Sequence, residues 1–119
     1  MREWIDKVKW LWSGRTFGNA IADSMTIPRG IFHRAMELGG LPDPEVVLAE
    51  IHRRGVSVME ARRVIAPIVI AGVLKLLAQV GAEDDFILAH SKLTHQFPHS
   101  GTRAAYADAF KNVDAMVKA

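Results

Sequence analysis

The hydrophobic pattern of the chain is dominated by residues 57–80, whose middle, residues 64–74, carries no polar side chain. Ser57 stands three residues before Glu60, which is the spacing of a capping box and predicts the start of a helix. A helix that is apolar on every side needs neighbours all around it. The pattern therefore predicts a central helix that the rest of the chain, a second copy or a partner covers.

Pro67 falls inside this segment and has no N–H to donate to the carbonyl of Arg63. The sequence leaves two alternatives open, one helix that kinks at the proline or two helices that meet at Ala66. A membrane-spanning helix is the less favoured interpretation, because a span needs about 20 apolar residues and charged side chains close this run at both ends. We expect no contact with a membrane.

Amphipathic spacing and turn residues predict further helices on both sides of the central one. Asp43 is expected to cap a helix that has Pro44 at its first position, and Ser13-Gly14 and Gly39-Gly40 are expected to end helices. No segment reads as a strand. The chain is predicted to be all-α, a single compact helical domain over residues 1–119 with six or seven helices, at about 2–12, 15–27, 28–38, 44–53, 57–80, 83–94 and 102–118.

Composition narrows the class of protein. The 119 residues suffice for one domain, and 50% hydrophobic with 24% charged residues is ordinary for a folded chain. The absence of cysteine excludes disulfides and thiolate chemistry, and it fits an intracellular, cytoplasmic protein. A formal net charge of +2 permits contact with nucleic acid without demanding it.

Catalytic patterns are poor in this sequence. It has neither a nucleophile elbow nor a glycine-rich phosphate loop, so we predict no catalytic residue, no cofactor and no enzyme. His90, His95 and His99 could approach a metal, but their spacing defines no ligand geometry, and we predict no metal site. The acidic residues at 83–85 are explained by the positive end of a helix.

Three tryptophans, Trp4, Trp10 and Trp12, lie in the first amphipathic segment. Helical spacing groups Trp4 and Trp12 with Ile5, Val8 and Leu11 on an apolar face, which we expect to cover the core, and leaves Trp10 off that face. Tryptophan is also over-represented at interface hot spots. The alternative interpretation is therefore a partner-binding helix that presents these tryptophans.

A second pattern concerns arginines around a turn at Gly55. A helix that ends at Arg53 and another that begins at Ser57 resemble a helix-turn-helix, with Arg53, Arg54, Arg62 and Arg63 near the turn and a recognition helix at about residues 57–66. The resemblance covers about twenty residues. Charged residues fall where that motif buries apolar side chains.

The function predicted from the sequence is association. We expect a small non-enzymatic assembly, adaptor or regulatory module that joins a second copy of itself or another protein through Trp4, Trp10 and Trp12. The alternative is a DNA-binding regulator that uses the four arginines. Two helices separated at Pro67 would favour this alternative, because the first would then be a free-standing recognition helix.

Overall fold

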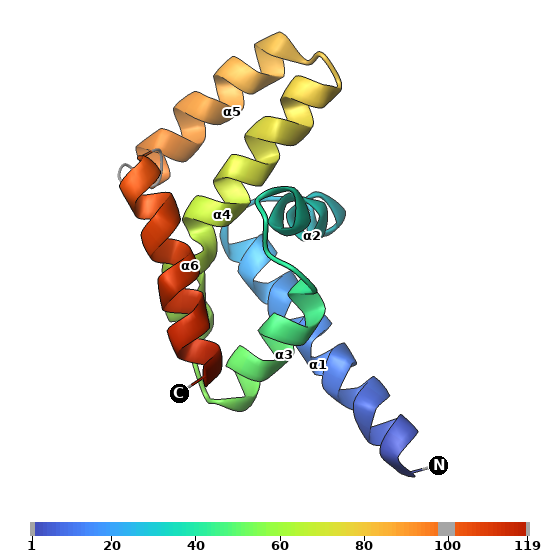
Figure 1. Ribbon diagram of the computed structural model, residues 1–119. Helices are drawn as coiled ribbons and strands as arrows, with labels where there is room; N and C mark the ends of the chain where they lie inside the picture. The colour runs from blue at the N-terminus through green and yellow to red at the C-terminus, as the bar shows by residue number, and fades with distance from the viewer. Residues whose placement is uncertain (1, 98–101, 119) are drawn as a thin grey trace.

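The computed structural model describes residues 2–97 and 102–118, and every regular element in these ranges is an α-helix. The predicted all-α class is therefore confirmed, with six helices in the described part of the chain (Figure 1). Their bounds are α1 (Arg2–Ser24), α2 (Arg29–Leu38), α3 (Pro44–Arg53), α4 (Val58–Gln79), α5 (Glu83–Gln96) and α6 (Arg103–Lys118).

Helix α4 is the central element, as its uninterrupted apolar pattern predicts. The N–H of Glu60 donates to the hydroxyl of Ser57 at 3.1 Å, which confirms the predicted start. The buried positions extend from Ala61 to Val73, and α1, α2, α5 and α6 all pack against the helix. It continues through Pro67, so the alternative of two helices is wrong.

Helix α1 differs from the prediction, because one helix of 23 residues replaces the two expected. Gly14 does not end it. A Cβ at Gly14 would lie 2.8 Å from the backbone nitrogen of Ala49, and one at Gly18 would lie 2.8 Å from Cδ1 of Leu48. Both glycines thus allow α1 to approach α3 closely, and the hydroxyl of Ser13 donates to the carbonyl of Trp10 at 2.6 Å within the helix.

The segment that connects α2 to α3 is joined to α6 by a hydrogen bond. The hydroxyl of Tyr106, on α6, donates to the carbonyl of Gly39, which ends α2 as predicted. Gly40 has a φ of +101°, a conformation that suits glycine. Asp43 does precede Pro44 and α3, but its side chain makes no capping hydrogen bond, so the predicted cap is wrong in that respect.

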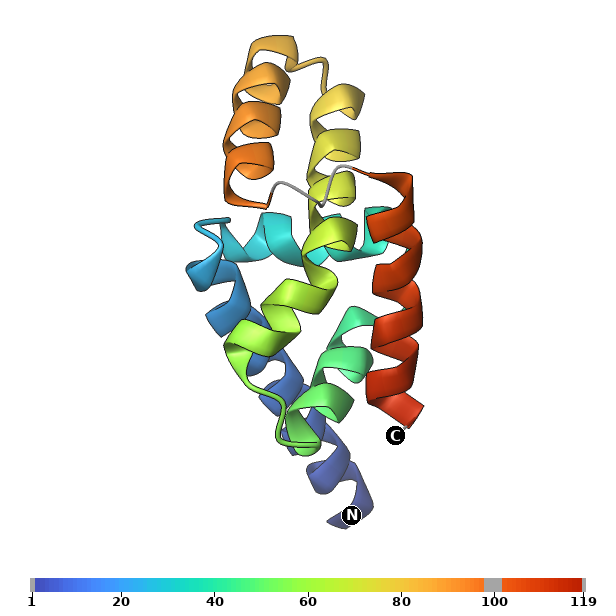
Figure 2. The same cartoon turned by 90° about the vertical axis from the view of Figure 1, so that its left-hand side faces the viewer.

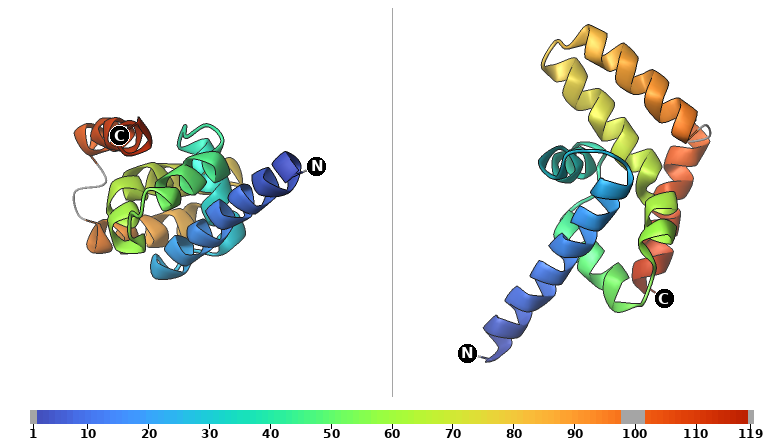
Figure 3. Two further views of the ribbon diagram at one scale, coloured as in Figure 1. Left: turned by 90° about the horizontal axis from the view of Figure 1, so that it is seen from below. Right: turned by 180° about the vertical axis from the view of Figure 1, so that it is seen from behind.

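The helices form an elongated molecule of 49 × 27 × 21 Å. At one end the first half of α1 projects beyond the other helices, and at the opposite end α4 and α5 form a hairpin (Figures 1 and 2). The view from behind shows the same separation (Figure 3). Within the described residues, no helix combines the length and the hydropathy that a membrane crossing would need.

Candidate protein-interaction site

A row of large apolar side chains is exposed on the projecting half of α1. The exposed fractions are 70% for Trp4, 45% for Ile5, 45% for Val8 and 65% for Trp12. We call these four residues the α1 ridge. The prediction that Trp4 and Trp12 cover the core is therefore wrong, and the structure places them where a partner could reach them.

Two causes act together: residues 2–9 of α1 project beyond the other helices and are exposed on every side, and where α1 does pack, it packs through a different face. Its buried positions are Gly14, Phe17, Gly18, Ile21 and Ala22. At about 100° per residue, the centre of this buried face lies roughly a third of a turn from the centre of the ridge. Hydrophobic periodicity predicts that the face with the largest apolar side chains is buried. Helix α1 instead packs through a face that includes Gly14 and Gly18, which add nothing to a hydrophobic pattern.

Trp10 also departs from the prediction. It was expected to point outward, but it is half-buried and falls on the same side of the helix as Gly14 and Phe17. Of the three tryptophans it is therefore the least exposed. The spacing of Gly14 and Gly18, four residues apart next to Phe17, is the signal in the sequence that could have identified the packing face.

The charges on the projecting half of α1 are not evenly distributed. Lys7 and Lys9 are exposed and lie about 100° to either side of the centre of the ridge, whereas Glu3 and Asp6 lie behind it. At the base of the ridge, the guanidinium of Arg15 stands 5.9 Å from the ring centre of Trp12. The ridge is thus an apolar strip with basic borders.

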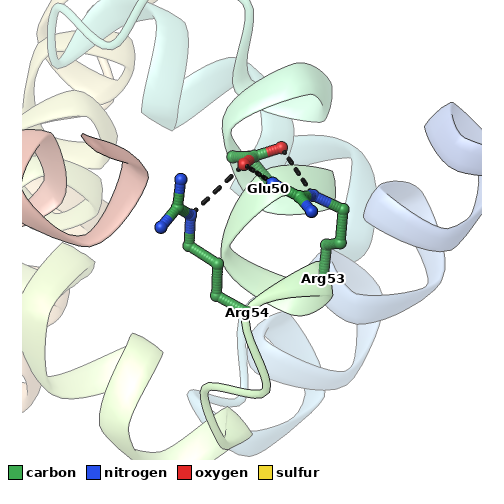
Figure 4. A network of polar contacts seen from close by, with 3 residues as sticks. All are labelled: Glu50, Arg53 and Arg54. Carbon is green, nitrogen blue, oxygen red and sulfur yellow. Dashed lines mark hydrogen bonds and ion pairs between the residues drawn. The ribbon is translucent and has the colours of Figure 1, made fainter. Parts of the chain in front are cut away.

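Two arginines of the predicted DNA-binding set, Arg53 and Arg54, share one partner within the chain (Figure 4). A nitrogen of Arg53 lies 2.6 Å from Oε1 of Glu50, and Nε of Arg54 lies 3.2 Å from the same oxygen. The hydrogen bond from Arg53, its charge and the weaker effects of Arg54 lower the pKa of the Glu50 carboxyl, against the opposing effect of desolvation. One carboxylate therefore pairs with both guanidinium groups.

Arg62 is also engaged, because it donates to the carbonyl of Ser24 at the end of α1, at 3.2 Å. Its guanidinium also stands 5.6 Å from the ring centre of Phe97. Arg63 lines an open cleft of about 1020 Å³ between α4 and α6. The structure therefore ties three of the four arginines to other groups, and α4 leaves no free-standing recognition helix.

The Glu50 network has a testable pH dependence. Because the folded-state pKa of Glu50 is lowered, its stabilising contribution is present at neutral pH and disappears as the pH falls below about 4, through the lowered pKa. We expect Glu50→Gln to be less stable than the parent at pH 7 and equally stable near pH 2. Urea unfolding at both pH values measures this difference. An unchanged difference at the acidic pH would contradict the assignment.

The histidines do not form a metal site in the described part of the chain. His90 and His95 are exposed on α5, and no group of three potential ligands is found among the described residues. His90 stacks on Phe86, with ring centres 6.1 Å apart. His99 lies outside the described residues.

Comparison with known proteins adds no assignment, because no family model, curated protein or solved structure matches the chain. The site is therefore defined by the exposure, packing and charge of the chain's own residues.

Proposed function

We propose that this protein is a non-enzymatic association module that binds another protein chain through the α1 ridge. The observation that carries the proposal is the exposure of two tryptophans and two aliphatic residues in one row on a projecting helix. Contiguous apolar patches on a protein surface mark interaction sites. Tryptophan contributes strongly to binding energy at the centres of such sites.

The α1 ridge also lies on a helix whose position is fixed before a partner binds. The second half of α1 is held against α3 at Gly14 and Gly18, so the helix that carries the ridge is anchored before any partner arrives. A pre-organised surface loses less conformational entropy on association. Burial of apolar area contributes about 25 cal/mol per Å², and each tryptophan can bury about 150 to 250 Å².

DNA binding through Arg53, Arg54, Arg62 and Arg63 is the second proposal that the sequence suggests. Glu50 and the carbonyl of Ser24 already engage three of these side chains. Phosphate contacts would compete with those partners for the same guanidinium groups, at a cost in electrostatic energy. Association through the α1 ridge needs no such rearrangement, and we favour it for this reason.

The test is site-specific photocrosslinking in the cells that produce the protein. A benzophenone side chain in place of Val8, in the middle of the ridge, is expected to give a discrete protein adduct. The matched control carries the same group in place of Val80, an exposed apolar residue just after α4. Trp4→Ser combined with Trp12→Ser should remove the Val8 adduct without changing the thermal unfolding temperature. A Val8 variant that gives no more adduct than the Val80 variant would overturn the proposal.

A further inference from the structure

An apolar groove lies at the end of α1 opposite to the α1 ridge. Its volume is about 330 Å³, and it forms where the end of α1 and the start of α2 meet the α4–α5 hairpin. The walls are mainly aliphatic, and the rim carries a few polar groups. We call it the hairpin groove; its apolar lining includes Met25, Ile27, Ile31, Leu76, Leu77 and Leu93.

We propose that the hairpin groove of one copy receives the α1 ridge of a second copy, so that two chains form a reciprocal dimer. The inference rests on the proposed function, because it takes the α1 ridge to be the association surface. It adds the identity of the partner and the surface to which the ridge binds.

The chemistry of the two surfaces is complementary. The groove is concave and apolar, and its volume lies near the lower limit of about 300 Å³ for ligand pockets, which suits a tryptophan side chain. An indole ring that is buried needs an acceptor for its N–H. The side chains of Thr26, Asp85 and Gln96 in the groove lining supply oxygen atoms that can accept it.

The charges are complementary as well. The ridge is bordered by Lys7 and Lys9. The hairpin groove is lined by Asp85, which lies next to Glu83 and Asp84 in the first turn of α5, and by Lys92, so acidic groups outnumber basic ones around the α5 side of the groove. Two ridges packed against each other would instead bring lysines of both copies together. Like charges at an interface are destabilising. The charge pattern therefore favours ridge-to-groove over ridge-to-ridge association.

The positions of the two surfaces determine the symmetry. The ridge lies on the first half of α1 and the groove begins at the opposite end of the same helix, so a chain cannot fill its own groove. Two copies placed side by side in opposite directions can make both contacts at once. This arrangement closes, whereas a head-to-tail arrangement continues as an open chain.

The experiment is sedimentation velocity over a concentration series of the purified full chain. We expect the parent to dimerise, and we expect both the ridge variant (Trp4→Ser with Trp12→Ser) and the groove variant (Ile31→Lys) to weaken dimerisation by at least 30-fold. Ile87→Ser is the matched control, because Ile87 is exposed on the face of α5 opposite the groove and should leave the dimer unchanged. Thermal melts verify that each variant is folded.

A mixture of the ridge variant and the groove variant provides the decisive readout. Each variant alone should be monomeric, but the mixture should form a one-to-one dimer, because one intact ridge then meets one intact groove. Asp85→Lys, on the exposed rim, should weaken the dimer at low salt, and Lys7→Glu with Lys9→Glu in the mixed partner should restore it. These variants keep the test valid if Ile31→Lys does not fold.

Two outcomes would overturn the inference. A parent chain that stays monomeric at all concentrations would do so, as would a groove variant that dimerises like the parent. Neither outcome refutes the proposed function, which depends on the Val8 adduct in cells. An adduct with a different protein, together with a monomeric purified chain, would leave the α1 ridge as an interaction site and reject the second copy as its partner.

Discussion

Replacing Ile68 by aspartate is expected to leave the chain unfolded at neutral pH. Ile68 is 0% exposed in the middle of α4, and no buried polar side chain is found among the described residues to pair with a carboxylate. Desolvating an unpaired ion costs several kcal/mol, and protonating it instead also costs free energy at pH 7. With the lost isoleucine packing, the total reaches about 5 kcal/mol or more, comparable to the whole stability of a domain.

Circular dichroism and thermal melting measure this result, with Met59→Asp as the control. Met59 lies on the same helix but is exposed, so its carboxylate stays in water and the variant should fold. A cooperative melt of Ile68→Asp would contradict the central position of α4. The apolar pattern alone gives Leu76 the same rank as Ile68, but Leu76 is half-buried at the hairpin groove, and we expect Leu76→Asp to be much milder.

Replacing Gly72 by alanine is expected to destabilise the protein by about 3 kcal/mol, although alanine is the better helix former. A Cβ at Gly72 would fall on the carbonyl oxygen of Ala35 and lie 2.7 Å from its Cα. The obstacle is the backbone of α2, which cannot move aside as a flexible side chain can. Helices α2 and α4 would have to separate, and the melting temperature should fall by about 10 °C.

Gly30→Ala is the matched control for this substitution. Gly30 lies in the first turn of α2, and a Cβ there would have no neighbour within 4 Å. The variant should therefore gain up to about 1 kcal/mol from the lower entropy of its unfolded chain. Urea unfolding compares the two variants with the parent. A Gly72→Ala variant as stable as Gly30→Ala would show that α2 and α4 do not approach as closely as described.

Local signals in the sequence predicted much of the fold. Ser57 and Glu60 marked the start of α4, Pro44 the start of α3, and Gly39-Gly40 the end of α2. Each signal depends on hydrogen bonds and backbone conformations within a few residues, so it can be interpreted without knowledge of the neighbours. Pro67 was ambiguous because the packing around α4, and not local preference, decides whether a helix continues through a proline.

The difference between local signals and tertiary packing also explains why the sequence predicted the candidate site only in part. Periodicity identified the apolar face of α1 that holds Trp4 and Trp12, but it could not tell whether that face meets the core. The close approach of α1 to α3 at Gly14 and Gly18 decided this, and it left the ridge exposed. The sequence could not show the partner of Arg62, because Ser24 lies far from it along the chain, whereas Glu50 stands at helical spacing from Arg53 and Arg54.

The sequence by itself determined that this protein is all-α and that the segment after Ser57 is its central helix, because a helix with apolar side chains on every face can be stable only when it is surrounded. Only the tertiary structure decided which face of α1 is buried. A glycine contributes nothing to a hydrophobic pattern, yet it permits the closest packing between two helices. The orientation of α1 therefore follows from backbone contact and not from side-chain hydrophobicity, and the projection of its first half adds to the exposure of Trp4.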